Sequence, residues 1–192
     1  SIFGRRPPSD WGEIERKPMT GIRRRTAERL SVAWSAIPHV TQYDLADLTE
    51  LNVFRKRRID ETGEGPTVTA MLVKVVAAAL RSFPVFATAA DMAAGEIVFR
   101  KYVHIGVAVD TDRGLLVPVI RDADSKGLIE ISAELKKLAD KARAHTLTLD
   151  DMQGGVFTIT NLGGLGGTYF APIVNWPEVG ILGASRASTQ PA

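Results

Sequence analysis

Apolar residues recur at helical spacing in four segments of this sequence, as in Leu128, Ile131, Leu135, Leu138 and Ala142. Side chains three and four residues apart lie on one side of a helix, so each segment predicts a helix with an apolar face. The third segment is apolar on nearly all sides, which predicts that it is buried between other layers. Counted from their capping residues, the four predicted helices span residues 20–37, 49–59, 67–82 and 128–142.

Shorter segments rich in β-branched and aromatic residues predict strands. These strands are expected at residues 39–45, 96–99, 103–109, 115–120, 156–160 and 179–184. The turn residues at 111–114, Thr-Asp-Arg-Gly, join two of the strands and predict a hairpin. Mixed strands and helices predict a two-layer α/β fold, in which a mixed sheet carries helices on one side.

The composition is that of an ordinary globular domain, because 45% of the 192 residues are hydrophobic and 24% are charged. The formal net charge of +2 is too small to indicate a nucleic-acid partner. Cysteine is absent from the sequence, which excludes disulfides and thiolate metal sites and fits a reducing cytoplasm. The most apolar run, 71–80, is interrupted by Lys74 and is far shorter than the ~20 residues of a membrane helix. We therefore expect no membrane segment.

Residues 1–18 differ from the rest of the chain because they are rich in proline and charge. Trp11 and Ile14 are interpreted as their strong apolar anchors. This composition predicts an arm or linker that lies on another surface, followed by one folded domain over residues 19–192.

A glycine cluster follows the predicted strand at 156–160, which ends in Thr160 and continues into Asn161. A phosphate-binding P-loop requires Lys and Ser or Thr directly after its glycines, whereas Thr-Tyr-Phe stands at 168–170. A dinucleotide site requires a helix after the glycines, and the prolines at 172 and 177 prevent a long one. The pattern instead favours a hydroxyl held on a rigid strand beside a path for a substrate.

The three histidines do not predict a metal site, because none has an acidic residue or second histidine at metal-ligand spacing. His39 is interpreted as a structural residue between a helix and a strand, and His104 as a packing residue on a strand. His145 ends the fourth predicted helix, where a cation suits the helix dipole. No metal is expected.

Two groups of charged residues are interpreted as surface or turn residues and not as binding or catalytic sites. The arginines at 23–25 and the basic run at 55–58 could meet phosphates, but solvated helix faces are favoured. Asp110 and Asp112 could be paired acids, but they flank a turn, where aspartate commonly bonds to the backbone.

Several motifs in order resemble the catalytic domain of dihydrolipoamide acyltransferases, the core subunits of 2-oxo acid dehydrogenase complexes. The likeness extends from about Pro18 to Arg186. It rests on Met19-Thr20-Gly21-Ile22-Arg23, Ala27-Glu28-Arg29-Leu30, Ile37-Pro38-His39-Val40-Thr41, His104-Ile105-Gly106-Val107-Ala108-Val109-Asp110-Thr111, Gly114-Leu115-Leu116-Val117-Pro118-Val119-Ile120, Phe157-Thr158-Ile159-Thr160-Asn161-Leu162-Gly163 and Pro172-Ile173-Val174-Asn175-Trp176-Pro177-Glu178-Val179. The resemblance implies a chloramphenicol acetyltransferase-like fold and homotrimers that assemble into a larger core.

The resemblance also implies a reaction, in which an acyl group moves between dihydrolipoamide on a separate lipoyl domain and coenzyme A, without a metal. It assigns the hydroxyl that stabilises the oxyanion to Thr160, where many relatives carry serine, and a substrate and coenzyme A channel to Asn161, Gly163 and Gly164. Such a donor contributes about 3 kcal/mol when it is well placed. Without the resemblance, Thr160 is simply a β-branched strand residue. The expected partners are lipoyl domains and the other components of such a complex, with no nucleic acid and no membrane.

The family places its general base in a His-Arg-x-x-Asp-Gly-like motif in a further C-terminal segment. None of His39, His104 and His145 matches it, so we expect a domain that lacks this segment. Residues 166–175 look most like acetyl-transferring bacterial members, so acetyl is favoured over branched-chain acyl, and succinyl is favoured least. A cytoplasmic location is favoured, or the mitochondrial matrix for a eukaryotic source. The alternatives are a non-catalytic scaffold with the same fold and a generic ligand-binding α/β domain.

Overall fold

The structure is a computed structural model that describes residues 8–189. Its helices are α1 (Gly21–Ala36), α2 (Thr49–Thr62), α3 (Val68–Ser82) and α4 (Leu128–Arg143). Its strands are β1 (Thr88–Asp91), β2 (Glu96–Phe99), β3 (Ile105–Val107), β4 (Val119–Ile120), β5 (Phe157–Asn161) and β6 (Ile181–Ala184). Short 3₁₀ turns lie at η1 (Pro8–Trp11), η2 (Pro84–Ala87), η3 (Asp150–Met152) and η4 (Gly163–Leu165).

A four-stranded sheet in the order β4-β3-β5-β6 forms the centre of the domain. Strands β3, β5 and β6 are parallel, and β4 runs antiparallel to β3. The register pairs Val107 with Ile159 and Ile159 with Leu182, and these three side chains belong to the core or pack against it. Since side chains alternate along a strand, Thr158 and Thr160 point to the opposite face of the sheet.

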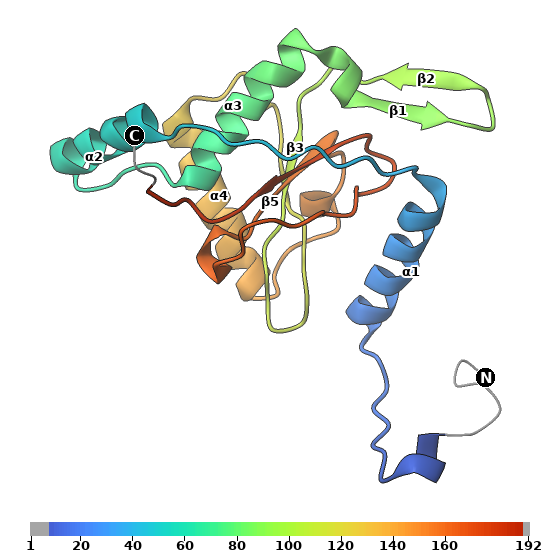
Figure 1. The fold of residues 1–192 in the computed structure, drawn as a ribbon. Helices are drawn as coiled ribbons and strands as arrows, with labels where there is room; N and C mark the ends of the chain where they lie inside the picture. The colour runs from blue at the N-terminus through green and yellow to red at the C-terminus, as the bar shows by residue number, and fades with distance from the viewer. Residues whose placement is uncertain (1–7, 190–192) are drawn as a thin grey trace.

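Helices α3 and α4 cover one face of the sheet (Figure 1). Val73 and Leu80 of α3 and Ile131 and Leu138 of α4 meet the sheet in one continuous apolar core. The predicted two-layer α/β fold with helices on one side is therefore confirmed. Burial of these apolar faces supplies the main stabilisation of the domain.

The prediction that the third helix is buried on nearly all sides is wrong for this chain alone. One side of α3 packs on β5 and α4, but Val75 is 56% exposed, and Ala78 and Ala79 are exposed with it. The helix can bury only the stripe that faces the sheet, and nothing within residues 8–189 covers the other stripe.

The predicted strand at 39–45 is also wrong, because these residues form no ladder within the described chain. They run extended between α1 and α2, across the front of the domain in Figure 1. Val40 is 94% exposed, so the alternating pattern there does not mark a face that this chain buries. An alternating pattern predicts extended backbone, whereas a strand also requires a neighbour with which to exchange hydrogen bonds.

The predicted hairpin forms, but its regular ladder is shorter than expected. Its turn is closed by hydrogen bonds between Thr111 and Gly114, and Val109 pairs with Leu116 beyond it. Pro118 lacks an N–H to donate, and it only accepts a bond from Val107 N. The ladder is therefore interrupted between this bridge and β4. The sequence pattern also missed β1, which pairs antiparallel with the predicted strand β2 in a hairpin that projects from the domain (Figure 1).

The N-terminal region stands away from the sheet in Figure 1. Trp11 is 77% exposed, and α1 buries only Ala33. Residues 1–7 of the predicted arm lie outside the described residues, so the arm stays a prediction. Among residues 8–189, no helix is long and apolar enough to cross a membrane.

Candidate functional site

The side chain of Thr160 lies on the face of the sheet opposite α3 and α4. Its strand, β5, is held between β3 and β6, so the side chain stands on a rigid support. Thr160 is only 8% exposed, yet its hydroxyl forms no hydrogen bond within the described chain. The oxygen is not sealed from solvent, because no completely buried side-chain N or O atom among residues 8–189 lacks a partner. The hydroxyl therefore keeps a donor that no group of the described chain uses.

Small residues flank Thr160 on both neighbouring strands. The register pairs Thr160 with Gly183 on β6, and its continuation places Ala108 beside it on the β3 side. The aromatic ring of Phe170 rests on Gly183, where an added Cβ would lie 2.7 Å from Phe170 Cζ. A side chain at 183 would therefore have to displace the ring. The sequence analysis did not single out Phe170, because its contact with Gly183 joins residues from different segments.

The predicted channel residues lie immediately after Thr160. Asn161 Nδ2 donates to Thr69 Oγ1 on α3 at 3.1 Å, and Gly163 N donates to Asn161 Oδ1 at 2.8 Å. An added Cβ on Gly163 would lie 3.0 Å from Asn161 Oδ1, whereas Gly164 has open space around it. Asn161 and Gly163 thus build the turn, and Gly164 presents backbone to solvent. Their part in a substrate channel stays a prediction.

The exclusion of a dinucleotide site is consistent with the structure around these glycines. The only regular element within 163–180 is η4, a short 3₁₀ turn of residues 163–165. A helix with its N-terminus at the glycines, which would bind a pyrophosphate, does not form in this described segment.

A buried carboxyl group, which the sequence analysis did not identify, lies on the same side of the sheet as Thr160. Glu178 is 4% exposed. Thr158 Oγ1 donates to its Oε2 at 2.7 Å, and Asn175 Nδ2 donates to its Oε1 at 3.0 Å. Thr158 shares its side of β5 with Thr160, so the carboxyl group fixes the segment 172–178 against the strand that carries Thr160.

Two arginines surround this carboxyl group. Arg29 of α1 donates to Asn175 Oδ1 at 3.3 Å, and Arg100 donates to the carbonyls of Gly155 and Pro177 at 3.2 and 3.1 Å. Burial raises the pKa of Glu178, while the hydrogen bonds from Thr158 and Asn175 and the two positive charges oppose that rise. The cluster ties together α1, the segment after β2, β5 and residues 172–178.

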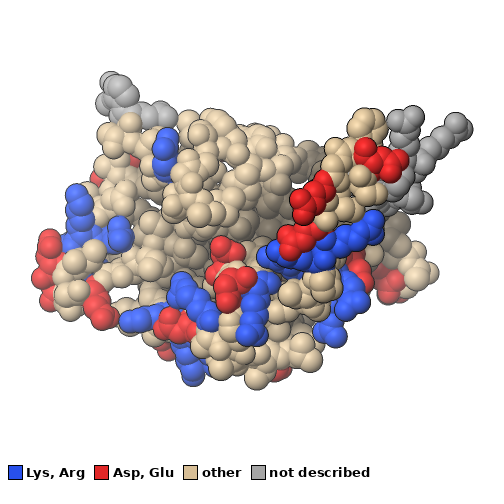
Figure 2. All heavy atoms as spheres, turned by 90° about the horizontal axis from the view of Figure 1, so that it is seen from below, with Lys and Arg blue, Asp and Glu red and all other residues tan. Residues whose placement is uncertain are grey.

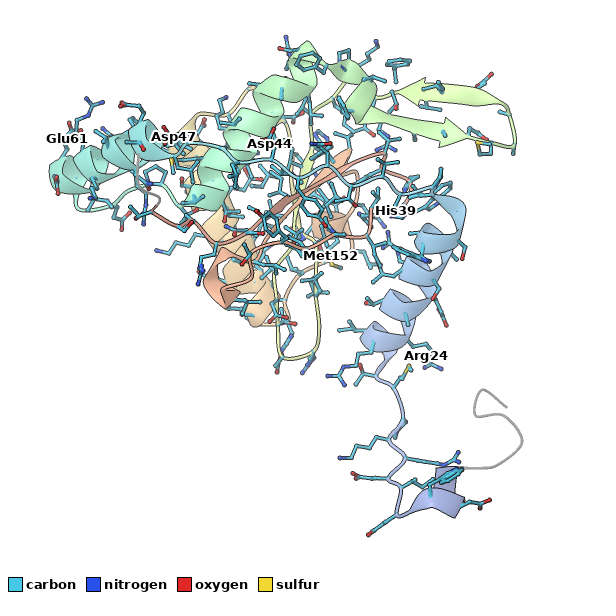
Figure 3. The ribbon with its side chains drawn as sticks, in the orientation of Figure 1. Arg24, His39, Asp44, Asp47, Glu61 and Met152 are labelled. Carbon is cyan, nitrogen blue, oxygen red and sulfur yellow. The ribbon has the colours of Figure 1, made fainter. Side chains whose placement is uncertain are left out.

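His39 is a structural residue, as predicted. Its Nδ1 lies 2.9 Å from the carbonyl of Ile37, and Val174 N donates to its Nε2 at 3.1 Å. Because Nε2 accepts the hydrogen bond from Val174 N, Nδ1 is assigned as the nitrogen that donates to the Ile37 carbonyl. The ring stacks on Trp34 at a centroid distance of 5.2 Å, beside the end of α1 (Figure 3).

The other two histidines lie close to acidic residues, which sequence spacing alone did not indicate. Asp122 N donates to His104 Nδ1 at 3.0 Å, and His145 Nε2 lies 3.1 Å from Asp112 Oδ1. Asp112 in the hairpin turn therefore lies next to His145, which follows α4. The described chain has no group of three or more His, Cys, Asp or Glu side chains placed to hold a metal ion.

The basic runs are helix surface, as expected. Arg23, Arg24 and Arg25 are exposed on α1, and Arg57 and Arg58 of α2 pair with Glu61. Figure 2 shows Lys and Arg interspersed with Asp and Glu over the face in view. Such mixing of charges is typical of solvated surface.

Known proteins are similar to this chain in both sequence and fold. The sequence matches the family described as 2-oxoacid dehydrogenases acyltransferase (catalytic domain) over residues 12–192. It is 48% identical to the dihydrolipoyllysine-residue acetyltransferase component of the pyruvate dehydrogenase complex of Azotobacter vinelandii, over 94% of this chain and 29% of that protein. The chain spans about a third to a half of the length of the curated relatives that it matches.

Solved structures agree with the family match. One is dihydrolipoamide acetyltransferase of Azotobacter vinelandii, studied for the role of a serine, a histidine and an asparagine in its catalytic mechanism. It superimposes with a TM-score of 0.92 at 47% identity, covering 96% of this chain and 77% of that one. The cubic core of the pyruvate dehydrogenase multienzyme complex gives a TM-score of 0.91 at 47% identity, with the same coverage of 96% and 77%.

These likenesses confirm the predicted chloramphenicol acetyltransferase-like fold. The sequence match, the structural match and the position of Thr160 on the sheet agree, and the chain belongs to the 2-oxoacid dehydrogenase acyltransferase (catalytic domain) family.

Proposed function

We propose that this domain transfers an acetyl group between dihydrolipoamide and coenzyme A within a pyruvate dehydrogenase complex. The observation that carries the proposal is the Thr160 hydroxyl, which lies without a hydrogen-bond partner in the described chain on the side of a central strand opposite α3 and α4. The family match and the names of the relatives supply the reaction class and favour acetyl as the acyl group. Coenzyme A and the lipoyl group are substrates in this account, and no metal takes part.

The reaction converts one thioester into another. A thiol gives its proton to a base as its sulfur attacks the thioester carbonyl, and the new C–S bond moves an electron pair onto the carbonyl oxygen. The tetrahedral intermediate then collapses, the original C–S bond breaks, and the departing thiolate takes up the proton. The charge on the oxygen exists only between these two steps, so a donor aimed at it accelerates the reaction without tightening substrate binding.

Thr160 is suited to that donation because its hydroxyl needs no rearrangement to become available. On the β3 side Ala108 presents only a methyl group beside Thr160, whereas the ring of Phe170 lies over Gly183 on the β6 side. One such donor contributes about 3 kcal/mol, or about a hundredfold in rate. The serine studied in the catalytic mechanism of the Azotobacter enzyme supports a hydroxyl in this role.

We infer that the general base comes from a part of the protein other than residues 8–189. His39 uses both ring nitrogens in backbone hydrogen bonds, and His145 is paired with Asp112. The backbone of His104 pairs with Val156, at the opposite end of β5 from Thr160. The histidine studied in the Azotobacter enzyme is consistent with a base from elsewhere, because this chain covers 77% of that one.

The proposed partners follow from the relatives. The likeness to a cubic core supports homotrimers that assemble into a larger core, served by lipoyl domains and the other components of the complex. The relatives are bacterial, which supports action in the cytoplasm.

The test uses the full-length protein in its assembled form, with acetyl-CoA and dihydrolipoamide as substrates. We expect coenzyme A thiol to be released in step with the formation of S-acetyl dihydrolipoamide. Assembled protein that forms no acetyl thioester under these conditions would contradict the proposal and leave the non-catalytic scaffold. Reading the full coding sequence for a His-Arg-x-x-Asp-Gly-like motif identifies the proposed base.

A further inference from the structure

The hairpin of residues 109–116 continues directly from the strand beside Thr160. Ala108 lies next to Thr160, and the hairpin begins at the following residue. Because β3 and β5 are parallel, the hairpin extends the sheet beyond the end of β5 at which Thr160 lies. In Figure 1 it is the yellow-green loop that hangs below the sheet beside α4. The hairpin therefore starts about one strand spacing from Thr160, on the β3 side.

The backbone hydrogen bonds of the hairpin leave its tip weakly attached to the sheet. Val109 and Leu116 exchange two hydrogen bonds, at 2.8 and 3.0 Å. Thr111 and Gly114 close the turn with bonds of their own. Pro118 interrupts the ladder between these bonds and β4, because it has no N–H to donate. The position of the tip therefore depends on contacts outside the hairpin.

The polar contact at the tip joins Asp112 to His145, which follows α4. The Nε2 atom of His145 lies 3.1 Å from Oδ1 of Asp112. The side chain of Asp112 is 76% exposed and that of His145 is 23% exposed, so either can be replaced without opening a cavity in the core. The tip also approaches α1, where an added Cβ on Gly114 would lie 3.8 Å from Ile22 Cγ2.

The backbone of His145 has a conformation that favours glycine. Its φ is +59°, in the left-handed region. His145 N donates to the carbonyl of Ala142 at 3.2 Å, and Thr146 N donates to that of Lys141 at 2.9 Å. A helix that ends with this pair of bonds commonly carries glycine at the left-handed position. The end of α4 thus does not itself require a histidine, and what the histidine adds is the imidazole ring beside Asp112.

The strength of this contact depends on the charge of the imidazole ring. A histidine side chain gains a positive charge as the pH falls from about 8 to about 5. The carboxylate of Asp112 and the carbonyl end of α4 both attract such a charge. The other charged residues around the contact occur in pairs of opposite sign, namely Lys141 bonded to Asp151, Arg143 bonded to Asp140, and Asp110 with Arg113 in the hairpin.

We propose that Asp112 and His145 form a pH-sensitive latch that holds the hairpin in place beside Thr160. They are positioning residues, because they act on the reaction through the hairpin. The kinetic consequence rests on the proposed function, whereas the latch itself does not. A positive charge on the ring strengthens the latch, and loss of either side chain releases the tip of the hairpin.

The test measures amide hydrogen exchange of residues 109–116 in the assembled full-length protein, at about pH 6 and about pH 8. At the lower pH we expect H145Q and D112N to exchange these amides up to about fivefold faster than the parent, which is the range for exposed ion pairs. The ratio of variant to parent should be smaller at the higher pH, because fewer histidine rings carry a charge there. Comparison at equal pH removes the intrinsic pH dependence of exchange.

Two further variants separate the latch from a general loss of stability. H145G removes the ring and suits the left-handed backbone, so it should release the hairpin while α4 stays protected from exchange. R143Q is the matched control, because Arg143 pairs with Asp140 within the same exposed helix end, at 3.2 Å. It should leave the exchange of residues 109–116 at the parental rate.

The kinetic readout is acetyl transfer between acetyl-CoA and dihydrolipoamide. The three latch variants should raise KM for at least one substrate by up to about fivefold with kcat nearly unchanged, because the hairpin lies beside Thr160 without bonding to the oxyanion. Parental exchange in H145Q, H145G and D112N at both pH values would overturn the latch, and faster exchange with parental KM values would overturn its positioning role. Faster exchange in a protein whose parent transfers no acetyl group would support the latch and contradict the proposed function alone.

Discussion

The carboxyl group of Glu178 allows a stability prediction that can be worked from the structure. Glu178 is buried, and it accepts hydrogen bonds from Thr158 and Asn175 with Arg29 and Arg100 nearby. Glu178→Gln keeps the shape and removes the charge. The amide can accept one of the two hydrogen bonds, and the Thr158 hydroxyl can reverse to accept from the amide, so the lost hydrogen bonding is worth about 1 kcal/mol.

The pH dependence has a definite sign. Burial raises the pKa of Glu178 above its ordinary value of 4.5, so the fold favours the protonated carboxyl group more than the unfolded chain does. The stability that the group contributes is complete below that ordinary value and is lost as the pH rises through the raised pKa of the folded state. The unfolding free energy of the parent protein, relative to that of E178Q, should therefore be highest at acid pH and should fall toward neutral pH. Each unit by which the pKa is raised changes the difference by about 1.4 kcal/mol.

The assay is urea unfolding of both proteins in steps from about pH 4 to about pH 8, with the difference in unfolding free energy as the readout. Glu96→Gln on the exposed strand β2 is the matched control for the removal of one negative charge. Glu178→Ala leaves both donors without an acceptor and should cost about 2–6 kcal/mol. A difference between parent and E178Q that stays constant or grows in favour of the parent with rising pH would refute the account of this carboxyl group.

Two further predictions concern the supports of the sheet. Ile131 of α4 is completely buried. In urea titrations, Ile131→Ala should lower the unfolding free energy by about 2–5 kcal/mol and Ile131→Val by about 0.5–1.5 kcal/mol. Equal losses in the two variants would contradict tight packing around this side chain. Asn161→Ala removes the bonds to Thr69 and Gly163, and it should cost about 1–3 kcal/mol and increase protease cleavage in residues 163–167; an unchanged cleavage rate would show that the turn does not depend on this side chain.

Local patterns in the sequence predicted the elements that are stabilised within this chain. The apolar face of α4 and the Thr67 cap of α3 were predictable because the contacts that they make lie within residues 8–189. The segment 39–45 was mispredicted because its alternation indicates extended backbone, while strand pairing depends on a neighbour that the sequence does not reveal. The exposed apolar side of α3 was mispredicted for a similar reason. An apolar helix surface in the sequence indicates that something packs against it, but the sequence does not identify the partner.

The sequence likewise predicted only part of the candidate site. Thr160 was found because the resemblance placed a hydroxyl there, and the structure adds its position on the side of β5 opposite α3 and α4. Glu178 and Phe170 were not predicted from the sequence because each contacts a residue of another segment. Glu178 accepts a hydrogen bond from Thr158, and the Phe170 ring lies against Gly183. The proximity of His145 to Asp112 was missed for the same reason.

The most direct test of the central claim is the turnover of Thr160 variants in the assembled full-length protein, with acetyl-CoA and dihydrolipoamide at saturating concentration. Loss of the donor in Thr160→Ala should lower kcat about a hundredfold with little change in KM, because the hydroxyl acts on charge that exists only in the transition state. Thr160→Ser, which keeps the hydroxyl, should recover most of the rate. Parental turnover in Thr160→Ala would contradict the account and leave Thr160 as a packing residue of β5.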